Sequence, residues 1–185
     1  MRIHRSLGRL SDFAQVLVLG ERSSKFHDLV YALKYHWRQS REDTLLESVD
    51  AFLRRFSSIE VDAVVSVPPN DRSRRVQPVP RVASKVAELM AAAFLPEALT
   101  VVRDVPDFKQ VEPIRRARLL RRAYRLREGL SVRELRVLVV DDFILTGCTL
   151  REVGRTLKAA GAVPYALVLS EAREFGRPCQ RKEFQ

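Results

Sequence analysis

The sequence contains few cysteines and histidines and no long apolar run, and each shortage excludes a class of protein. The two cysteines, Cys148 and Cys179, have no metal-ligand spacing and can build no disulfide framework, as expected in a reducing compartment. The three histidines, His4, His27 and His36, form no paired zinc motif. Apolar runs are far shorter than the roughly 20 residues that cross a membrane, and the N-terminal stretch lacks the apolar length and cleavage site of a signal peptide. We therefore expect a cytoplasmic protein without a membrane span.

The composition is that of one globular domain with an excess of positive charge. The chain has 185 residues, of which 46% are hydrophobic and 30% charged, enough to bury a core without disulfides. Lys and Arg number 33 against 23 Asp and Glu, so the net charge is +10. Half of this surplus lies in residues 101–135, which hold ten basic and five acidic residues. Such a balance favours anionic partners, whether phosphates, nucleotides or nucleic acid.

Hydrophobic periodicity predicts an α/β fold with a mainly parallel sheet. Apolar, β-branched runs predict strands over 14–19, 61–67, 100–103, 135–140 and 164–170. Apolar residues at helical spacing predict helices over 27–36, 41–56, 81–94 and 149–160. Strands that alternate with helices through short connections are typical of a parallel sheet covered by helices. Because no Ser/Gly-rich linker occurs, we expect one domain, with a helical or hood segment at 1–56, a core at 57–172 and a polar tail at 173–185.

The segment that carries recognisable chemistry is Val137-Leu-Val-Val-Asp-Asp-Phe-Ile-Leu-Thr-Gly-Cys-Thr149, in which two acids follow a buried strand and a small-residue loop opens a helix. Ligands of open α/β sheets bind at the carboxyl ends of the strands. Residues 146–149 (Thr-Gly-Cys-Thr) would present backbone N–H groups and two hydroxyls at a helix N-terminus, which favours phosphate. Asp141 and Asp142 suit a ribose diol, directly or through Mg²⁺. The alternative is a solvated acidic turn before a plainly capped helix.

This segment resembles the 5-phosphoribosyl-1-pyrophosphate (PRPP) motif of type I phosphoribosyltransferases, and the chain is similar to their ComF-like (competence protein F) branch. Residues 29–35 (LVYALKY) resemble an early helix of that branch, and residues 61–75 resemble its strand and pyrophosphate loop. Lys109-Gln110 and the arginines after it resemble its basic flexible segment. The resemblance implies a type I phosphoribosyltransferase-like α/β fold, a mostly parallel central sheet flanked by helices, with a small hood.

The chain departs from the family pattern in four ways. The usual Thr-Thr-Gly-x-Thr reads Leu-Thr-Gly-Cys-Thr over residues 145–149. Leu145 stands where purine-salvage relatives carry an acid that acts on the base, which disfavours their mechanism. Pro78-Val-Pro-Arg81 replaces a Gly-Phe-Asn-Gln stretch, and the amino-terminal zinc ribbon of many relatives is missing.

The resemblance implies a binding role for each part of the motif. The phosphate site would comprise Thr146, Gly147, Cys148 and Thr149, and the catalytic acids Asp141 and Asp142 would hold the ribose hydroxyls and Mg²⁺. Pyrophosphate would be bound by Pro69, Asn70, Asp71, Arg72 and Lys109. Since prolines remove the N–H groups of residues 68 and 69, residues 70–72 must supply the donors. The implied reaction transfers ribose 5-phosphate from PRPP to a nitrogenous base, with a homodimer common among relatives.

Seven arginines and no acid occur in residues 115–127, which we call the arginine segment. Three interpretations stay open: contact with pyrophosphate, contact with nucleic acid, or a solvated amphipathic helix. The residues expected to contact nucleic acid are Arg115, Arg116, Arg118, Arg121 and Arg122. The ComF-like resemblance implies a non-catalytic alternative, a protein that binds single-stranded DNA and partners in DNA uptake or recombination.

Overall fold

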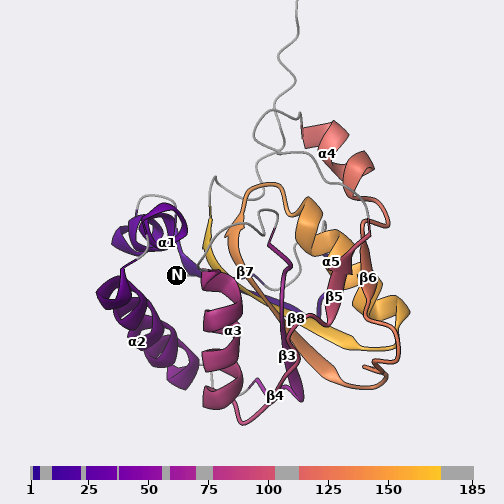
Figure 1. The fold of residues 1–185 in the computed structure, drawn as a ribbon, viewed down its shortest axis with the longest axis horizontal. Coiled ribbons are helices and arrows are strands. Elements are labelled where there is room, and N and C mark those ends of the chain that lie inside the picture. Colours follow the sequence, from indigo (N-terminus) through magenta and orange to yellow (C-terminus); the bar gives the residue numbers. More distant parts are fainter. Residues whose placement is uncertain are drawn as a thin grey trace, which may run out of the picture.

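The computed structural model describes residues 2–4, 10–21, 24–36, 38–55, 59–69, 77–102 and 113–171. Its centre is a six-stranded sheet with the strand order β1-β2-β8-β7-β3-β4 (Figure 1). The bounds of these strands are β1 Arg2–His4, β2 Gln15–Gly20, β3 Ala63–Ser66, β4 Ala93–Phe94, β7 Arg136–Ile144 and β8 Val163–Glu171. All neighbours run parallel except β1 and β2. A second, two-stranded antiparallel sheet joins β5 (Leu99–Val101) to β6 (Tyr124–Leu126). The fold is therefore the mostly parallel, helix-flanked α/β architecture that the sequence predicts.

The central strands form because their side chains are apolar on both faces. Residues 137–140 of β7 are at most 1% exposed and alternate between two hydrophobic clusters. Val137 and Val139 face one cluster, whereas Leu138 and Val140 face the other. Strands buried on both faces require cover on both, which is the condition for a parallel sheet.

Helices cover one face, and a helix together with the small sheet covers the other. α1 (Lys25–Tyr35), α2 (Gln39–Arg55) and α3 (Pro78–Leu89) contribute to the same cluster as Leu138 and Val140. α5 (Cys148–Ala159), β5 and β6 contribute to the opposite cluster. Figure 1 shows these groups on opposite sides of the sheet, with α4 (Pro113–Leu120) near the N-terminal end of α5. Among the residues described, no helix has the length and apolarity needed to cross a membrane.

Element boundaries differ most clearly from the predicted ones at two places. The helix predicted over 81–94 ends at Leu89, because Ala91 takes a positive φ of 51° and Ala93–Phe94 then pair with β3. The strand predicted over 135–140 continues to Ile144, since β8 pairs with it. The strand predicted over 14–19 forms as β2, in the sheet interior between β1 and β8.

Candidate functional site

The phosphate loop (residues 145–149) connects β7 to α5 at the carboxyl edge of the sheet. Gly147 is the N-cap of α5 and takes the left-handed conformation, with φ of 70°, which a glycine adopts without steric cost. The Gly147 carbonyl accepts from the Arg151 N–H at 2.9 Å and so closes the first helical turn. α5 follows because its apolar residues, Leu150, Val153 and Leu157, recur at helical spacing and are at most 1% exposed. The free backbone N–H groups and the positive end of the helix dipole therefore lie at this edge.

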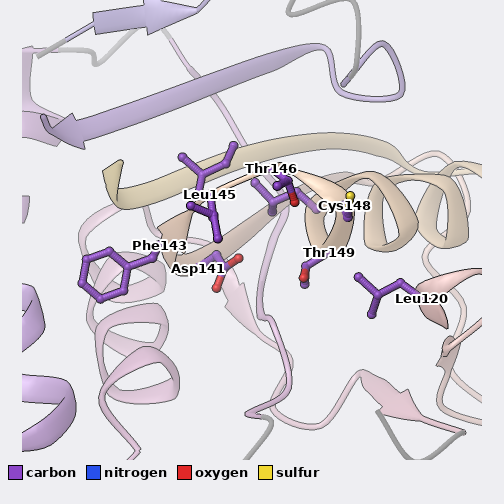
Figure 2. A pocket seen from close by; sticks show the side chains of 10 residues that line it. Leu120, Asp141, Phe143, Leu145, Thr146, Cys148 and Thr149 are labelled. Carbon is purple, nitrogen blue, oxygen red and sulfur yellow. The ribbon is translucent and has the colours of Figure 1, made fainter. Parts of the chain in front are cut away.

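A pocket of about 150 Å³ opens at this loop. It is lined by Leu120, Asp141, Phe143, Ile144, Leu145, Thr146, Gly147, Cys148, Thr149 and Leu150. In Figure 2 the Asp141 carboxylate and the Thr149 side chain lie on the same side of the pocket, and Phe143 extends away from them. The structure thus brings all four predicted phosphate-binding residues together with one of the two predicted acids.

The two acids are placed differently. Asp141 is 8% exposed, and its Oδ1 accepts from the Asp142 N–H at 2.9 Å. Asp142 is half-buried and outside the pocket lining, and its Oδ1 accepts from the Phe143 N–H at 2.7 Å. Both carboxylates therefore hold the backbone at the end of β7, and only the Asp141 carboxylate faces the phosphate loop.

The carboxylates of this edge suit Mg²⁺ bound together with a ligand better than a resident metal. Within the described ranges, no three His, Cys, Asp or Glu residues are grouped as a metal site. Mg²⁺ is commonly held by one or two carboxylates plus substrate phosphates. Asp141 offers one such carboxylate beside the predicted phosphate loop, whereas Asp142 lies outside the pocket lining.

The predicted pyrophosphate loop begins where β3 ends, next to β7. The Val67 N–H donates to the Val140 carbonyl at 2.9 Å, so the contact between this segment and β7 continues to Val67. Pro68 is buried and Pro69 half-buried. The other residues predicted to bind pyrophosphate, Asn70, Asp71, Arg72 and Lys109, lie outside the described residues.

The arginine segment contacts the pocket at Leu120, and the turn that follows Leu120 is hydrogen-bonded to α5. Leu120, the last residue of α4, is 2% exposed and lines the pocket. The Glu152 carboxylate on α5 is 7% exposed and accepts from the backbone N–H of Arg122, whose φ is 58°. The same carboxylate accepts from the Arg155 guanidinium. The chain between α4 and β6 is therefore attached to the second turn of α5.

The arginines of this segment project outward. Arg115, Arg118, Arg121 and Arg122 are exposed, while the side chain of Arg116 lies outside the description. Since their positive charges lie close to the Leu120 wall of the pocket, they add to the attraction for anions at this edge.

Two polar groups near the site were not among the predicted site residues. His27 on α1 places Nδ1 2.8 Å from the Ser170 hydroxyl and meets Phe143 edge to face at 5.2 Å between ring centroids. Tyr124 is 4% exposed, and its hydroxyl has no hydrogen-bond partner among the described residues. The sequence indicates Tyr124 only as an apolar contact of the arginine segment, because nothing local shows that its ring reaches α5.

Burial and two carboxylates raise the pKa of the Tyr124 phenol. Desolvation raises the pKa of Tyr124 well above its ordinary value, and the negative charges of Asp141 and Glu152 raise it further. The nearby Thr149 hydroxyl opposes this shift. The phenol is therefore a hydrogen-bond donor throughout the ordinary pH range.

No protein-family model matches the sequence, and no curated protein matches it significantly. Solved structures do match. An adenine phosphoribosyltransferase from Leishmania tarentolae superposes with a TM-score of 0.51 and 12% identity over 92% of this chain and 94% of that one. The adenine phosphoribosyltransferase from Leishmania donovani superposes with a TM-score of 0.49 and 10% identity, over 92% of this chain and 89% of that one. The one from Saccharomyces cerevisiae superposes with a TM-score of 0.47 and 15% identity, over 72% of this chain and 70% of that one. The first of these similarities extends over nearly the whole of both chains, so the chain has the fold of a phosphoribosyltransferase.

Proposed function

We propose that the protein binds Mg²⁺·PRPP or the 5′-phosphate of a nucleotide, and that it transfers ribose 5-phosphate to a nitrogenous base. The observation that supports this most directly is the pocket that joins the Asp141 carboxylate to the phosphate loop at the start of α5. A phosphate at a helix N-terminus next to a carboxylate that can accept from a diol matches the two ends of ribose 5-phosphate.

In this proposal the phosphate loop holds the 5-phosphate through the backbone N–H groups and hydroxyls of residues 146–149. Asp141 and Asp142 accept hydrogen bonds from the ribose hydroxyls and stabilise the positive charge that develops at C1 as its bond to pyrophosphate breaks. The nitrogen of the base forms the new bond to C1, and pyrophosphate leaves with the electron pair. Mg²⁺ would neutralise the leaving pyrophosphate. The chain contributes mainly positioning and electrostatic stabilisation.

The mechanism of purine-salvage enzymes is disfavoured, because an apolar side chain stands at the position of their acid. Leu145 lines the pocket and can neither accept from nor donate to a base. Base selection would then depend on groups other than residue 145.

A second candidate function is a non-catalytic ComF-type protein that binds single-stranded DNA. The arginine segment favours it, because its seven arginines are more than one pyrophosphate can use, and Arg115, Arg118, Arg121 and Arg122 are among those that are exposed. Contacts of this kind are made with phosphates, so the affinity for DNA would fall steeply with salt.

The two functions are separated by three measurements on the same variants. Pyrophosphate release from Mg²⁺·PRPP is measured with a panel of bases, PRPP binding is measured by calorimetry, and binding of single-stranded oligonucleotides is measured at several salt concentrations. The proposal predicts that Asp141→Asn abolishes turnover, whereas Asp50→Asn, a matched change on an exposed ion pair of α2, leaves it intact.

Two results would contradict these candidates. Absence of PRPP and nucleotide binding at millimolar concentration would refute the ligand proposal. If wild-type protein binds PRPP without turnover and binds oligonucleotides with a strong salt dependence that Asp141→Asn does not alter, the DNA-binding candidate replaces the enzyme.

A further inference from the structure

The feature that the proposed function leaves unexplained is the buried hydroxyl of Tyr124. A buried hydroxyl without a partner costs free energy, and native proteins satisfy most such groups. Tyr124 is 4% exposed, and its oxygen is the sole buried side-chain polar atom among the described residues that lacks a partner. A phenylalanine would fill the same space without that cost.

The backbone around Tyr124 is attached to α5 at two points. Arg122, two residues before Tyr124, donates its backbone N–H to Glu152, and the Tyr124 carbonyl accepts from the Thr156 hydroxyl at 3.4 Å. These two bonds attach the strand to successive turns of α5. Thr149, in the first turn of α5, and Asp141, on β7, are both close enough to the phenol to affect its pKa. Both of these residues line the pocket.

We propose that Tyr124 is a positioning residue for the ligand phosphate, whose hydroxyl donates to the Thr149 hydroxyl when phosphate occupies the loop. The inference rests on the proposed function, since it requires that the loop bind phosphate. A threonine hydroxyl has one proton, so Thr149 can donate to a phosphate oxygen and at the same time accept from another donor. A chain of two such hydrogen bonds is cooperative, because each bond polarises the next.

The neutral state of the phenol fits this role. A phenolate beside Asp141 would repel both the carboxylate and the incoming phosphate, whereas the neutral hydroxyl adds a donor without adding charge. In the free protein the hydroxyl lies beside the Thr149 side chain without forming a well-aligned hydrogen bond, and ligand binding would align the two groups. Part of the affinity for phosphate would thus come from a group that does not touch the ligand.

The test uses Tyr124→Phe, with Tyr165→Phe as the matched control. Tyr165 lies on β8 against the opposite hydrophobic cluster, in the half of the strand that is far from the site. Binding of ribose 5-phosphate and of inorganic phosphate is measured by calorimetry, and stability of the ligand-free proteins by thermal unfolding. We expect Tyr124→Phe to weaken both ligands about three- to tenfold, the effect of one hydrogen bond, and to leave the Tm of the free protein unchanged or raised. The control should bind as wild type does.

Two further readouts separate positioning from mere packing. Phosphate should change the ultraviolet absorption of a tyrosine in wild type and in Tyr165→Phe, and this signal should be absent in Tyr124→Phe. In a Thr149→Val background, Tyr124→Phe should cause no further loss of phosphate affinity, because the Thr149 hydroxyl through which Tyr124 acts is already absent.

Each failure has a distinct meaning. If wild-type protein binds neither ligand, both the proposed function and this inference are overturned. If wild type binds and Tyr124→Phe binds equally well, or if its affinity falls only together with a loss of Tm, the positioning role is overturned while the proposed function stands.

Discussion

Glu152 provides the sharpest test of how the arginine segment is held beside the pocket. Its carboxylate is buried on α5 and accepts from two donors, the backbone N–H of Arg122 and the guanidinium of Arg155. Replacing it with alanine leaves the Arg122 N–H without its acceptor at a residue that already has a left-handed φ of 58°. We therefore expect Glu152→Ala to destabilise the protein.

The magnitude follows from adding the separate contributions. A hydrogen bond to a charged acceptor contributes about 1.5–3 kcal/mol. The Arg155 side chain is 49% exposed, so solvent screening limits that ion pair to at most about 0.5 kcal/mol. Alanine regains a few tenths of a kcal/mol as the better helix former, roughly cancelling the ion pair. The net loss is about 2 kcal/mol, or about 4–8 °C in Tm for a chain of this size.

The assay is thermal and urea unfolding of wild type, Glu152→Ala, Glu152→Gln and Glu88→Ala. Glutamine keeps one neutral acceptor for the Arg122 N–H, so we expect about half the loss. Glu88 is the control, because it is an exposed helical glutamate whose partner Lys85 is also exposed. The loss of unfolding free energy in Glu88→Ala should be below about 0.5 kcal/mol. Should Glu152→Ala cost no more than Glu88→Ala, the turn between α4 and β6 is not held by this carboxylate.

Three further predictions concern the rest of the fold. Gly147→Ala should cost about 1–2 kcal/mol, because alanine is strained at φ of 70°, and unchanged denaturant unfolding would contradict this. Gly154→Ala should destabilise α5 although alanine is the better helix former, because its Cβ would lie 2.8 Å from Cζ of the buried Phe13. In unfolding experiments the double variant Gly154→Ala/Phe13→Leu should recover part of the lost stability. If it recovers none, the clash with Phe13 is not the cause. Hydrogen bonds from Arg136 lower the pKa of Asp62 from 3.8 to about 2, so the stability that this pair contributes is complete above pH 4 and lost as the pH falls toward 2. The difference in unfolding free energy between wild type and Asp62→Asn should shrink over that interval, and a constant difference would refute the linkage.

Much of the fold could be predicted from local sequence, because a strand that is buried on both faces appears in the sequence as an unbroken run of apolar residues. The run of β-branched residues in β7 and β3 indicated central strands, and the apolar spacing of α5 indicated its helix. Gly147, with Thr146 before it and Thr149 two residues after it, follows β7 and indicated a phosphate loop. The structure places these three residues in one pocket. The ends of elements were less predictable. β4 is two residues long and exists only because β3 offers an edge.

The candidate site was predictable only where it is contiguous in sequence. Asp141 and the phosphate loop are neighbours along the chain, so their proximity follows from one strand and one turn. Leu120 and Tyr124 come from a separate segment, and their contacts with α5 depend on the pairing of β6 with β5. No periodicity in that segment distinguishes a buried tyrosine beside the pocket from one that packs elsewhere.

The sequence by itself determined the layers of this protein and predicted one loop as a phosphate site, because apolar periodicity and the conformational needs of glycine act over a few residues. The tertiary structure decided which acid faces that loop, which turn carries the arginines to its rim, and that the Tyr124 hydroxyl is buried beside it without a partner. These facts depend on contacts between residues that are distant along the chain, and such contacts exist only once the sheet and α5 have packed together.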